Sequence, residues 1–324
     1  MALINTWLTN RFGLELPVVA ATMAGVADGW FAAAATRAGI LGGIGVSGTA
    51  SGDWITEQAA TAGEGPYAIG LQLWGLADHP DQFEATLAAR PAMVSLSFGD
   101  PTPYVERCHQ AGIVVVSQVG TAAAARAAVD AGVDAIVARG GEGGGHGVDQ
   151  VATLPLLQSV LEVVDVPVIA AGGIATARGL AAVLATGATG AWIGTAFTTC
   201  VESALPDDAV ALLAAAGEDA TSFGKVFDIA QRTGWPTEYG GRALINSFTA
   251  QWTGQEDRLA ADTVALDRFA AARAARDPEV LPVWAGQGAG LLDGHRRPIS
   301  DIVAELREAA GLLRAAVSAV EVQP

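Results

Sequence analysis

One stretch of this 324-residue chain sets two proton-transferring side chains in a loop that is otherwise nearly bare. Residues 138–147 read Ala-Arg-Gly-Gly-Glu-Gly-Gly-Gly-His-Gly, so Glu142 and His146 stand among six glycines. A backbone without Cβ atoms can approach a flat ligand closely. An imidazole can take a proton from a carbon acid at neutral pH, and His146 is therefore predicted to be catalytic. A flexible surface loop is the alternative interpretation of the glycines alone.

Other chemistries find little support among the remaining residues. Three further histidines fall in or beside predicted helices and are interpreted as surface or capping residues: His79, His109 and His295. Cys108 and Cys200 show no CxxC or Cys/His spacing, so neither a metal centre nor a disulfide framework is expected. No GxSxG nucleophile motif occurs, and Lys225 lacks the flanking residues of a Walker A phosphate loop.

The elements that must position this loop alternate between two kinds along the chain. Eight short apolar runs rich in β-branched residues are predicted strands: Pro17–Thr22, Ile40–Val46, Tyr67–Leu73, Met93–Phe98, Ile113–Val119, Val133–Ala138, Val166–Ala171 and Ala188–Ile193. Seven segments between them are predicted helices: Ala27–Ala38, Gly52–Ala62, Pro80–Ala89, Pro103–Ala111, Ala122–Ala131, Leu154–Val164 and Ala177–Ala185. Strands that are apolar throughout, separated by helices, indicate a parallel sheet covered on both faces.

The joints between these helices and strands repeat one form. Glycine stands just before the strand in Arg-Ala-Gly-Ile at 37–40, Gln-Ala-Gly-Ile at 110–113 and Asp-Ala-Gly-Val at 130–133, where a helix end favours a left-handed residue. Eight such units predict an α/β fold of the (β/α)8 TIM-barrel type. An open doubly wound sheet is the alternative, favoured by the GxGxxG at 43–48, but it leaves six units unexplained.

In a barrel, ligands bind on the loops at the carboxyl ends of the strands. After the seventh and eighth strands this chain has Gly172-Gly173-Ile174 and Gly194-Thr195, where many barrels hold a phosphate on backbone N–H groups. Most other residues at these strand ends are small or carry amides. We therefore expect an extended, planar, phosphate-bearing ligand.

The charge balance excludes several partners. Eighteen basic against 34 acidic residues give a net charge of −16, which disfavours nucleic acid and anionic membrane surfaces as binding partners.

The start of the chain does not have the pattern of a signal peptide. The uncharged run 179–201 is interrupted at Thr186–Gly190, so a helix, a turn and a buried strand explain it better than a membrane span. Together with the unpaired cysteines, these features predict a cytoplasmic protein.

The alternation of predicted strands and helices ends after the eighth strand. Residues 205–296 are predicted to form a mostly helical cap subdomain, with helices at Asp207–Ala216 and Asp257–Arg276. A closing helix is expected at Ser300–Val320, following Pro298. The predicted organisation is thus a barrel of residues 1–204 and 297–324 with an inserted cap at 205–296.

Five motifs together resemble the nitronate monooxygenase family, formerly called 2-nitropropane dioxygenases. They are PVVAATMAGV at 17–26, SFGDP at 97–101, the Gly-rich stretch at 138–147, PVIAAGGI at 167–174 and AGQGAG at 285–290. The resemblance covers nearly the whole chain. It implies a barrel with bound FMN that oxidises alkyl nitronates with O₂. The partners are then a small-molecule substrate and O₂, and a homodimer is compatible with this assignment.

Carried onto this sequence, the resemblance implies roles for individual residues. His146 would be the base or the substrate-orienting imidazole. The residues that would contact FMN are Met23, Gln72, Gln118, Gly141, Gly172, Gly173, Gly194 and Thr195. Gln287 and Gly288 would approach the flavin or the substrate from the cap. Beside them, Arg139 and Glu142 of the Gly-rich stretch are predicted to bind the substrate. No metal is implied.

This chain departs from the usual family pattern at four positions. Thr22 stands where members have Pro, Gln72 where they have Asn, Arg139 where they have Gln, and Gly143 where they have Ala. Arg139 would either place a fixed positive charge in the site, for an anionic substrate or reduced flavin, or pair with Glu142 at the rim.

Three alternatives stay open at this point. The first is a flavin reductase using NAD(P)H, of the enoyl-acyl-carrier-protein reductase II or quinone reductase type. The second is a flavin-free barrel like the IMP dehydrogenase class, which needs a cysteine on the loop where this chain has His146. The third is a protein that binds FMN without turnover.

Overall fold

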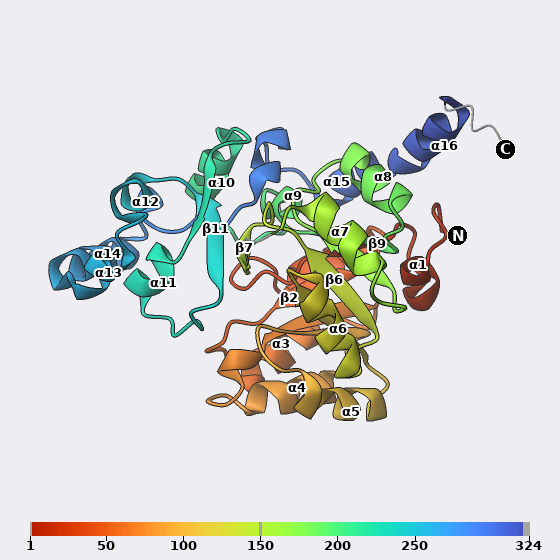
Figure 1. The fold of residues 1–324 in the computed structure, drawn as a ribbon, viewed down its shortest axis with the longest axis horizontal. Coiled ribbons are helices and arrows are strands. Elements are labelled where there is room, and N and C mark those ends of the chain that lie inside the picture. The colour runs from red at the N-terminus through yellow and green to blue at the C-terminus, as the bar shows by residue number, and fades with distance from the viewer. Residues whose placement is uncertain (1, 149–150, 320–324) are drawn as a thin grey trace.

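Eight parallel strands form a closed barrel in the computed structural model, which describes residues 2–148 and 151–319 (Figure 1). The strands follow the order β1-β9-β8-β6-β5-β4-β3-β2. Bridges from Val19 to Leu41 and from Ala24 to Gly45 join the first strand of this order to the last. Their bounds are β1 Val18–Ala20, β2 Gly42–Gly45, β3 Tyr67–Gln72, β4 Met93–Ser97, β5 Val114–Val119, β6 Ala135–Arg139, β8 Val168–Ala171 and β9 Gly190–Ile193. The (β/α)8 prediction is therefore confirmed.

Helices cover the outside of the barrel. They are α2 Gly29–Arg37, α3 Gly52–Ala62, α4 Asp81–Ala89, α5 Thr102–Gln110, α6 Ala122–Asp130, α7 Thr153–Leu161 and α8 Ala177–Ala185. Along each strand, side chains alternate between the helices and the barrel interior. Val18 and Val94, for example, belong to the outer cluster, whereas Val19 and Met93 belong to the inner one. Burial on both faces explains why the strands read as unbroken apolar runs.

A short helix at the start of the chain, α1 Trp7–Phe12, contributes to the barrel interior. Its Leu8 is fully buried with Val19 and Ile169 in the inner cluster. Thr6 caps this helix, because its side chain accepts a hydrogen bond from the Thr9 N–H. The sequence reasoning began at the first strand and did not predict α1.

The cap, the name used here for residues 205–296, is mostly helical and also contains strands that were not predicted. Its helices are α10 Asp207–Ala214, α11 Val226–Gln231, α12 Ser247–Trp252, α13 Glu256–Ala261 and α14 Thr263–Ala275, followed by the 3₁₀ helix η2 Gln287–Leu291. Strands β10 Thr221–Gly224 and β11 Gly240–Leu244 pair antiparallel, and β11 also pairs with β7 Gly145–Gly147 from the Gly-rich loop. The small sheet therefore ties the cap to the loop that carries His146 (Figure 1).

Two long helices of the prediction are each divided. The segment 257–276 breaks at Asp262, whose side chain accepts a hydrogen bond from Ala265 N–H at 2.9 Å and so begins α14. The closing helix is α15 Ile299–Leu306 followed by α16 Ala309–Ala319; Val320 of the predicted helix lies outside the described residues.

The uncharged run 179–201 contains most of α8, then β9 and the short helix α9 Thr195–Thr198. Within the described ranges, no helix has both the length and the apolar character that a bilayer crossing requires.

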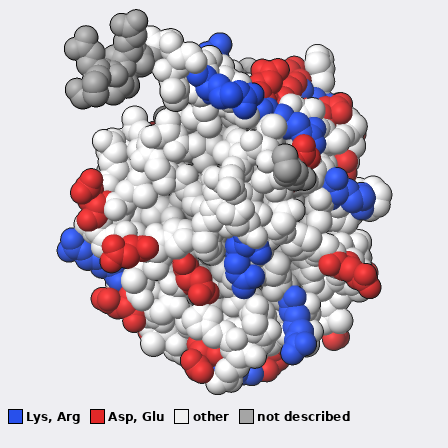
Figure 2. Space-filling view, turned by 90° about the vertical axis from the view of Figure 1, so that its right-hand side faces the viewer, with Lys and Arg blue, Asp and Glu red and all other residues white. Residues whose placement is uncertain are grey.

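A bidentate ion pair joins the C-terminal helices to the start of the barrel. Arg307 Nε and Nη2 donate to the two carboxylate oxygens of Glu15 at 2.9 and 2.8 Å. The hydrogen bonds from Arg307 lower the pKa of Glu15 below its ordinary value. Figure 2, which views the right-hand side of Figure 1, shows acidic and basic side chains interspersed, so the negative net charge is not concentrated on that face.

Replacing Arg307 by methionine is expected to lower the free energy of unfolding by at most about 1 kcal/mol, since the two side chains are 37% and 40% exposed to solvent. A carboxyl with a lowered pKa contributes stability above its ordinary pKa and loses it as pH falls through the lowered value. Wild type and R307M should therefore differ at neutral pH and converge in acid. Urea unfolding at several pH values measures this, and a constant difference down to strongly acidic pH would argue against the pair.

Candidate active site

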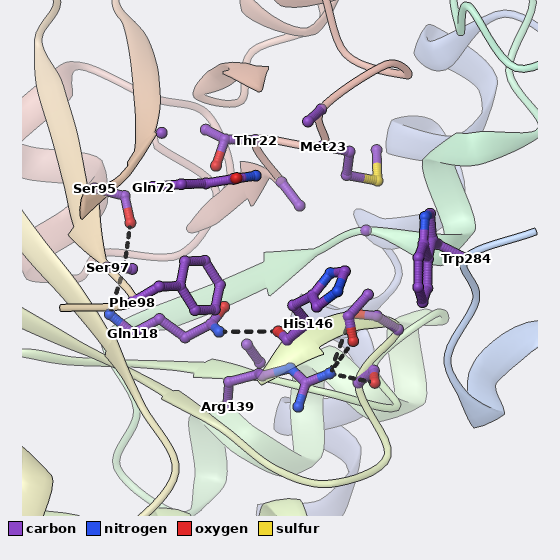
Figure 3. Close-up of a pocket in the computed structure, with 18 of the residues that line it drawn as sticks. Thr22, Met23, Gln72, Ser95, Ser97, Phe98, Gln118, Arg139, His146 and Trp284 are labelled. Carbon is purple, nitrogen blue, oxygen red and sulfur yellow. Dashed lines mark hydrogen bonds between the residues drawn. The ribbon is translucent and has the colours of Figure 1, made fainter. Parts of the chain in front are cut away.

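A cavity of about 340 Å³ opens at the carboxyl ends of the barrel strands. Ten of the thirteen residues predicted for the site line it: Met23, Gln72, Gln118, Arg139, His146, Gly172, Gly173, Gly194, Thr195 and Gly288. Figure 3 shows His146 near Gln118 and Trp284, with Thr22, Met23 and Gln72 across the cavity. Barrel loops, the Gly-rich loop and the cap all contribute walls, which is the arrangement of a ligand site rather than of a flexible surface loop.

Three predicted residues are not among those that line the cavity: Gly141, Glu142 and Gln287. The Glu142 carboxylate accepts hydrogen bonds from the N–H and Oγ1 of Thr153, both at 2.7 Å, and so caps the start of α7. Gly141 accepts from Arg242 Nε at 2.7 Å through its carbonyl oxygen. The side chain of Gln287 is exposed, while its N–H donates to the Glu142 carbonyl at 2.9 Å. These three residues therefore hold the Gly-rich loop in place through contacts outside the cavity.

His146 is held by a carboxylate from the cap. Its Nε2 lies 2.8 Å from Asp228 Oδ1, and the two side chains are 12% and 11% exposed. An ionised carboxylate can only accept, so the imidazole carries hydrogen on Nε2, and its Nδ1 is left with a lone pair when the ring is neutral. Nδ1 makes no hydrogen bond within the described ranges. His146 therefore presents a fixed basic nitrogen at a cavity wall.

Aromatic rings from the cap fix the plane of the imidazole. Trp235 stacks on His146 with ring centroids 3.7 Å apart and planes 3° from parallel. Trp284 approaches at 4.7 Å with a tilt of 52°. In the β7–β11 pair, His146 is opposite Gly241, where a Cβ would collide with the Trp284 ring. The glycine on β11 thus lets Trp284 lie beside the imidazole.

Sequence reasoning missed Asp228, Trp235 and Trp284 as site residues. Asp228 lies 82 positions after His146 and within a short helix, and the β7–β11 pairing that brings the cap to His146 joins segments almost a hundred residues apart. The available signal was the gathering of tryptophans between residues 235 and 284, which the composition of the cap shows.

Two amide side chains offer complementary groups to a ligand. Gly48 N–H donates to Gln72 Oε1 at 3.0 Å, which orients the Gln72 amide and leaves its Nε2 as a donor. Gln118 Nε2 donates to the His146 carbonyl at 3.3 Å, which leaves Gln118 Oε1 as an acceptor. Neither remaining atom is hydrogen-bonded in the described part of the chain. A ligand edge that alternates carbonyl and N–H groups would satisfy both.

Backbone amides at another wall are free for an anion. The N–H groups of Gly172, Gly173, Gly194 and Thr195 donate no hydrogen bond to any described residue. Gly172 and Gly173 have φ of +106° and +68°, a region that favours glycine, and consecutive N–H groups in such turns form concave anion sites. This is the position at which the sequence predicted a phosphate.

Arg139 organises the Gly-rich loop from inside. Its side chain is buried, and Nη2 donates to the carbonyl oxygens of Gly143, Gly144 and Gly145 at 2.6, 3.2 and 2.9 Å. A Cβ at Gly143 would lie 2.9 Å from Arg139 Nε. The differences from the family pattern at positions 139 and 143 are therefore coupled, because glycine at 143 leaves space for the side chain of Arg139. Of the expectations for Arg139, the pairing with Glu142 is wrong, since that carboxylate caps α7.

The cysteines take no part in this site. Burial raises the pKa of Cys108 to about 11 and that of Cys200 to about 12, so both thiols stay protonated at neutral pH. Neither residue lines the cavity. A cysteine nucleophile of the kind that the IMP dehydrogenase alternative requires is therefore not found here.

The fold and the site define a barrel enzyme that works on small molecules at the carboxyl ends of its strands. The chain belongs to the nitronate monooxygenase family, whose model, "Nitronate monooxygenase", matches residues 69–309. Members of this family are flavin-dependent oxidoreductases, generally with FMN.

Individual relatives carry different names. The chain is 32% identical to the nitronate monooxygenase of Paraburkholderia phytofirmans, over 92% of this chain and 93% of that protein. It is also 32% identical to (3aS,4S,5R,7aS)-5-hydroxy-7a-methyl-1-oxo-octahydro-1H-indene-4-carboxyl-CoA dehydrogenase of Rhodococcus jostii, over 76% of this chain and 69% of that protein. Among solved structures, FabK from Thermotoga maritima superposes with a TM-score of 0.84 at 27% identity, covering 98% of this chain and all of that one.

Proposed function

We propose that this protein is an FMN-dependent oxidoreductase that oxidises alkyl nitronates with O₂. The observation that carries the proposal is the fixed imidazole, whose Nε2 is bound to Asp228 while Nδ1 has no partner within the described ranges. A nitroalkane is a carbon acid whose anion is the nitronate, so a positioned base suits this substrate. The family match and the Paraburkholderia relative support it.

The residues at the cavity fit FMN. Its phosphate would be bound by the free amides of Gly172, Gly173, Gly194 and Thr195, and the polar edge of its ring by Gln72 Nε2 and Gln118 Oε1. Met23 and Gly288 would supply apolar and backbone surface. When bound, the cofactor supplies the electron chemistry, and the protein supplies position and charge.

The protein's own contribution is to bind, orient and deprotonate. His146 Nδ1 removes the proton from the nitroalkane carbon, and Asp228 stabilises the imidazolium that results through the Nε2–H hydrogen bond. The buried guanidinium of Arg139, which lines the cavity below the loop, favours the anionic nitronate. Trp235 and Trp284 restrict water around the imidazole.

An NAD(P)H-dependent flavin reductase is the second candidate. The similarity to FabK and to the Rhodococcus dehydrogenase supports it, because neither of those proteins is named a nitronate monooxygenase. The same imidazole would then protonate or deprotonate a carbon next to a carbonyl.

The two candidates are separated by which compound reduces the protein-bound flavin. We expect the purified protein to show an oxidised-flavin spectrum, with FMN released on denaturation. Without oxygen, ethyl nitronate should bleach this spectrum, and NADH and NADPH should not; with oxygen, nitronate should drive O₂ consumption. Rapid bleaching by a nicotinamide, with none by nitronate, would establish the second candidate, and a colourless protein that refuses added FMN would refute both.

The remaining parts of the proposal concern context. We propose that residues 205–296 act as a cap subdomain on the barrel, that the protein is cytoplasmic, and that it forms a homodimer. Size-exclusion chromatography with light scattering tests the last point, for which a monomer at micromolar concentration would be the contrary result.

A further inference from the structure

Four aromatic side chains line the cavity around His146, and they are called the aromatic wall here: Trp74, Phe98, Trp235 and Trp284. They come from η1 Leu73–Gly75, the end of β4, the loop after α11 and the segment before η2. Trp235 contacts two of the others and His146, with ring centroids 5.1 Å from Trp74, 5.0 Å from Phe98 and 3.7 Å from His146. Trp284 contacts His146 at 4.7 Å. A wall of this kind is far larger than proton transfer from a short alkyl chain requires.

Phe98 is held in an unfavourable backbone conformation. Its φ is +66°, in the left-handed region that residues other than Gly, Asn and Asp rarely adopt. Its ring is edge-on to both Trp235 and Tyr239, with interplanar angles of 88°. A bulky residue kept in this conformation at a cavity wall indicates that the direction of its ring is needed there.

Polar atoms beside this wall have no partner in the described structure. Trp74 Nε1, Thr233 Oγ1 and Asp228 Oδ2 are each buried and make no hydrogen bond among the described residues, and all three residues line the cavity. These atoms are also closed off from the cavity, so a ligand in it does not reach them, and the aromatic rings supply the recognition surface.

We infer that the preferred substrate is a carbon acid with a planar ring, the ring lying against the aromatic wall. Aromatic faces and edges recognise flat rings by geometry as well as by buried area. The acidic carbon then lies toward His146 Nδ1. This inference rests on the proposed function and names the substrate class for that site.

Equilibrium binding tests the ring preference without turnover. Calorimetry on the FMN-loaded protein compares methyl 4-hydroxybenzoate, a planar ester with a hydroxyl, with methyl hexanoate, an aliphatic ester of similar size. We expect the ring ester to bind at least tenfold more tightly. Trp235→Leu should weaken it roughly threefold to tenfold while changing the aliphatic ester little. Trp30→Leu is the matched control, since Trp30 is 56% exposed on α2, and it should leave both affinities unchanged.

A second variant guards against misfolding at Trp235. Phe98→Gly relieves the left-handed backbone, so it should fold, yet it should lose the ring preference in the same way. Equal binding of ring and aliphatic esters, or equal behaviour of W235L and W30L, would overturn the inference. Failure of ethyl nitronate to reduce the flavin would instead refute the proposed function, and the two results are read from separate assays.

Discussion

His146→Ala is expected to lower turnover of neutral nitroethane about 10²- to 10⁴-fold, the usual contribution of a positioned general base. The imidazole is fixed by Asp228 on one nitrogen and by stacking on Trp235, so its other nitrogen has a defined position in the wild type. Steady-state oxygen consumption measures the effect. The visible spectrum of the variant should show bound FMN, because His146 is not among the residues proposed to hold the cofactor.

The form of the substrate separates a base from a merely orienting residue. If His146 removes the proton, preformed ethyl nitronate should be oxidised by H146A with a much smaller loss than neutral nitroethane. Equal losses with both forms would assign His146 to orientation alone. Unchanged oxygen consumption with both forms would show that the imidazole has no part in the reaction. His79→Ala, at a partly exposed histidine outside the cavity, is the matched control.

The barrel could be predicted because its signals are local. Each predicted strand coincides with an observed one to within two residues at either end. The joint glycines were expected to be left-handed, and Gly39, Gly112 and Gly132 have φ of +92°, +75° and +94°. A buried parallel strand and a helix C-terminus are each encoded within a few residues, so a single sequence is enough to locate them.

Apart from Gly288 of the cap, the predicted residues that line the cavity lie on the barrel side. Residues at strand ends share one rim because of the topology, which explains why Gln72, Gln118 and His146 meet at one cavity. Asp228 reaches that rim only through the antiparallel pairing of β7 with β11, which joins residues almost a hundred positions apart. No local pattern encodes this pairing. The division of the helix at Asp262 was missed for a simpler reason, since a capping aspartate inside an Ala-rich run is easily taken as helical surface.

The Gly-rich loop shows how an isolated motif can be misassigned in part. Glu142 attracted attention as a carboxylate beside the histidine, yet its side chain caps α7. Two of the glycines allow close contacts. A Cβ at Gly144 would collide with the backbone of Gly286, and a Cβ at Gly147 would collide with the side chain of Arg139. The loop is therefore held by close packing against the cap and by the guanidinium within it, which gives His146 a rigid support.

Asp228→Asn is expected to reduce turnover of neutral nitroethane by about 10²-fold or more, approaching the roughly 10⁴-fold effect known for carboxylates that fix a catalytic imidazole. The carboxylate accepts from Nε2–H and leaves the Nδ1 lone pair for the substrate. An asparagine amide can donate to Nε2 instead, which favours the tautomer with hydrogen on Nδ1 and removes the basic nitrogen from the cavity. The substitution is isosteric, so packing around α11 should persist.

Three readouts distinguish this role from a structural one. The ¹⁵N chemical shifts of the His146 ring should report hydrogen on Nε2 in wild type and on Nδ1 in D228N. The loss should fall mainly on kcat, and D228E should recover part of it, because a carboxylate can still accept from Nε2. Asp267→Asn, on the cap helix α14, serves as the control for removing a negative charge from the cap. If D228N retained both the wild-type tautomer and wild-type kcat, the carboxylate would not position the imidazole, and His146 would have to act through its contacts with Trp235 and Trp284 alone.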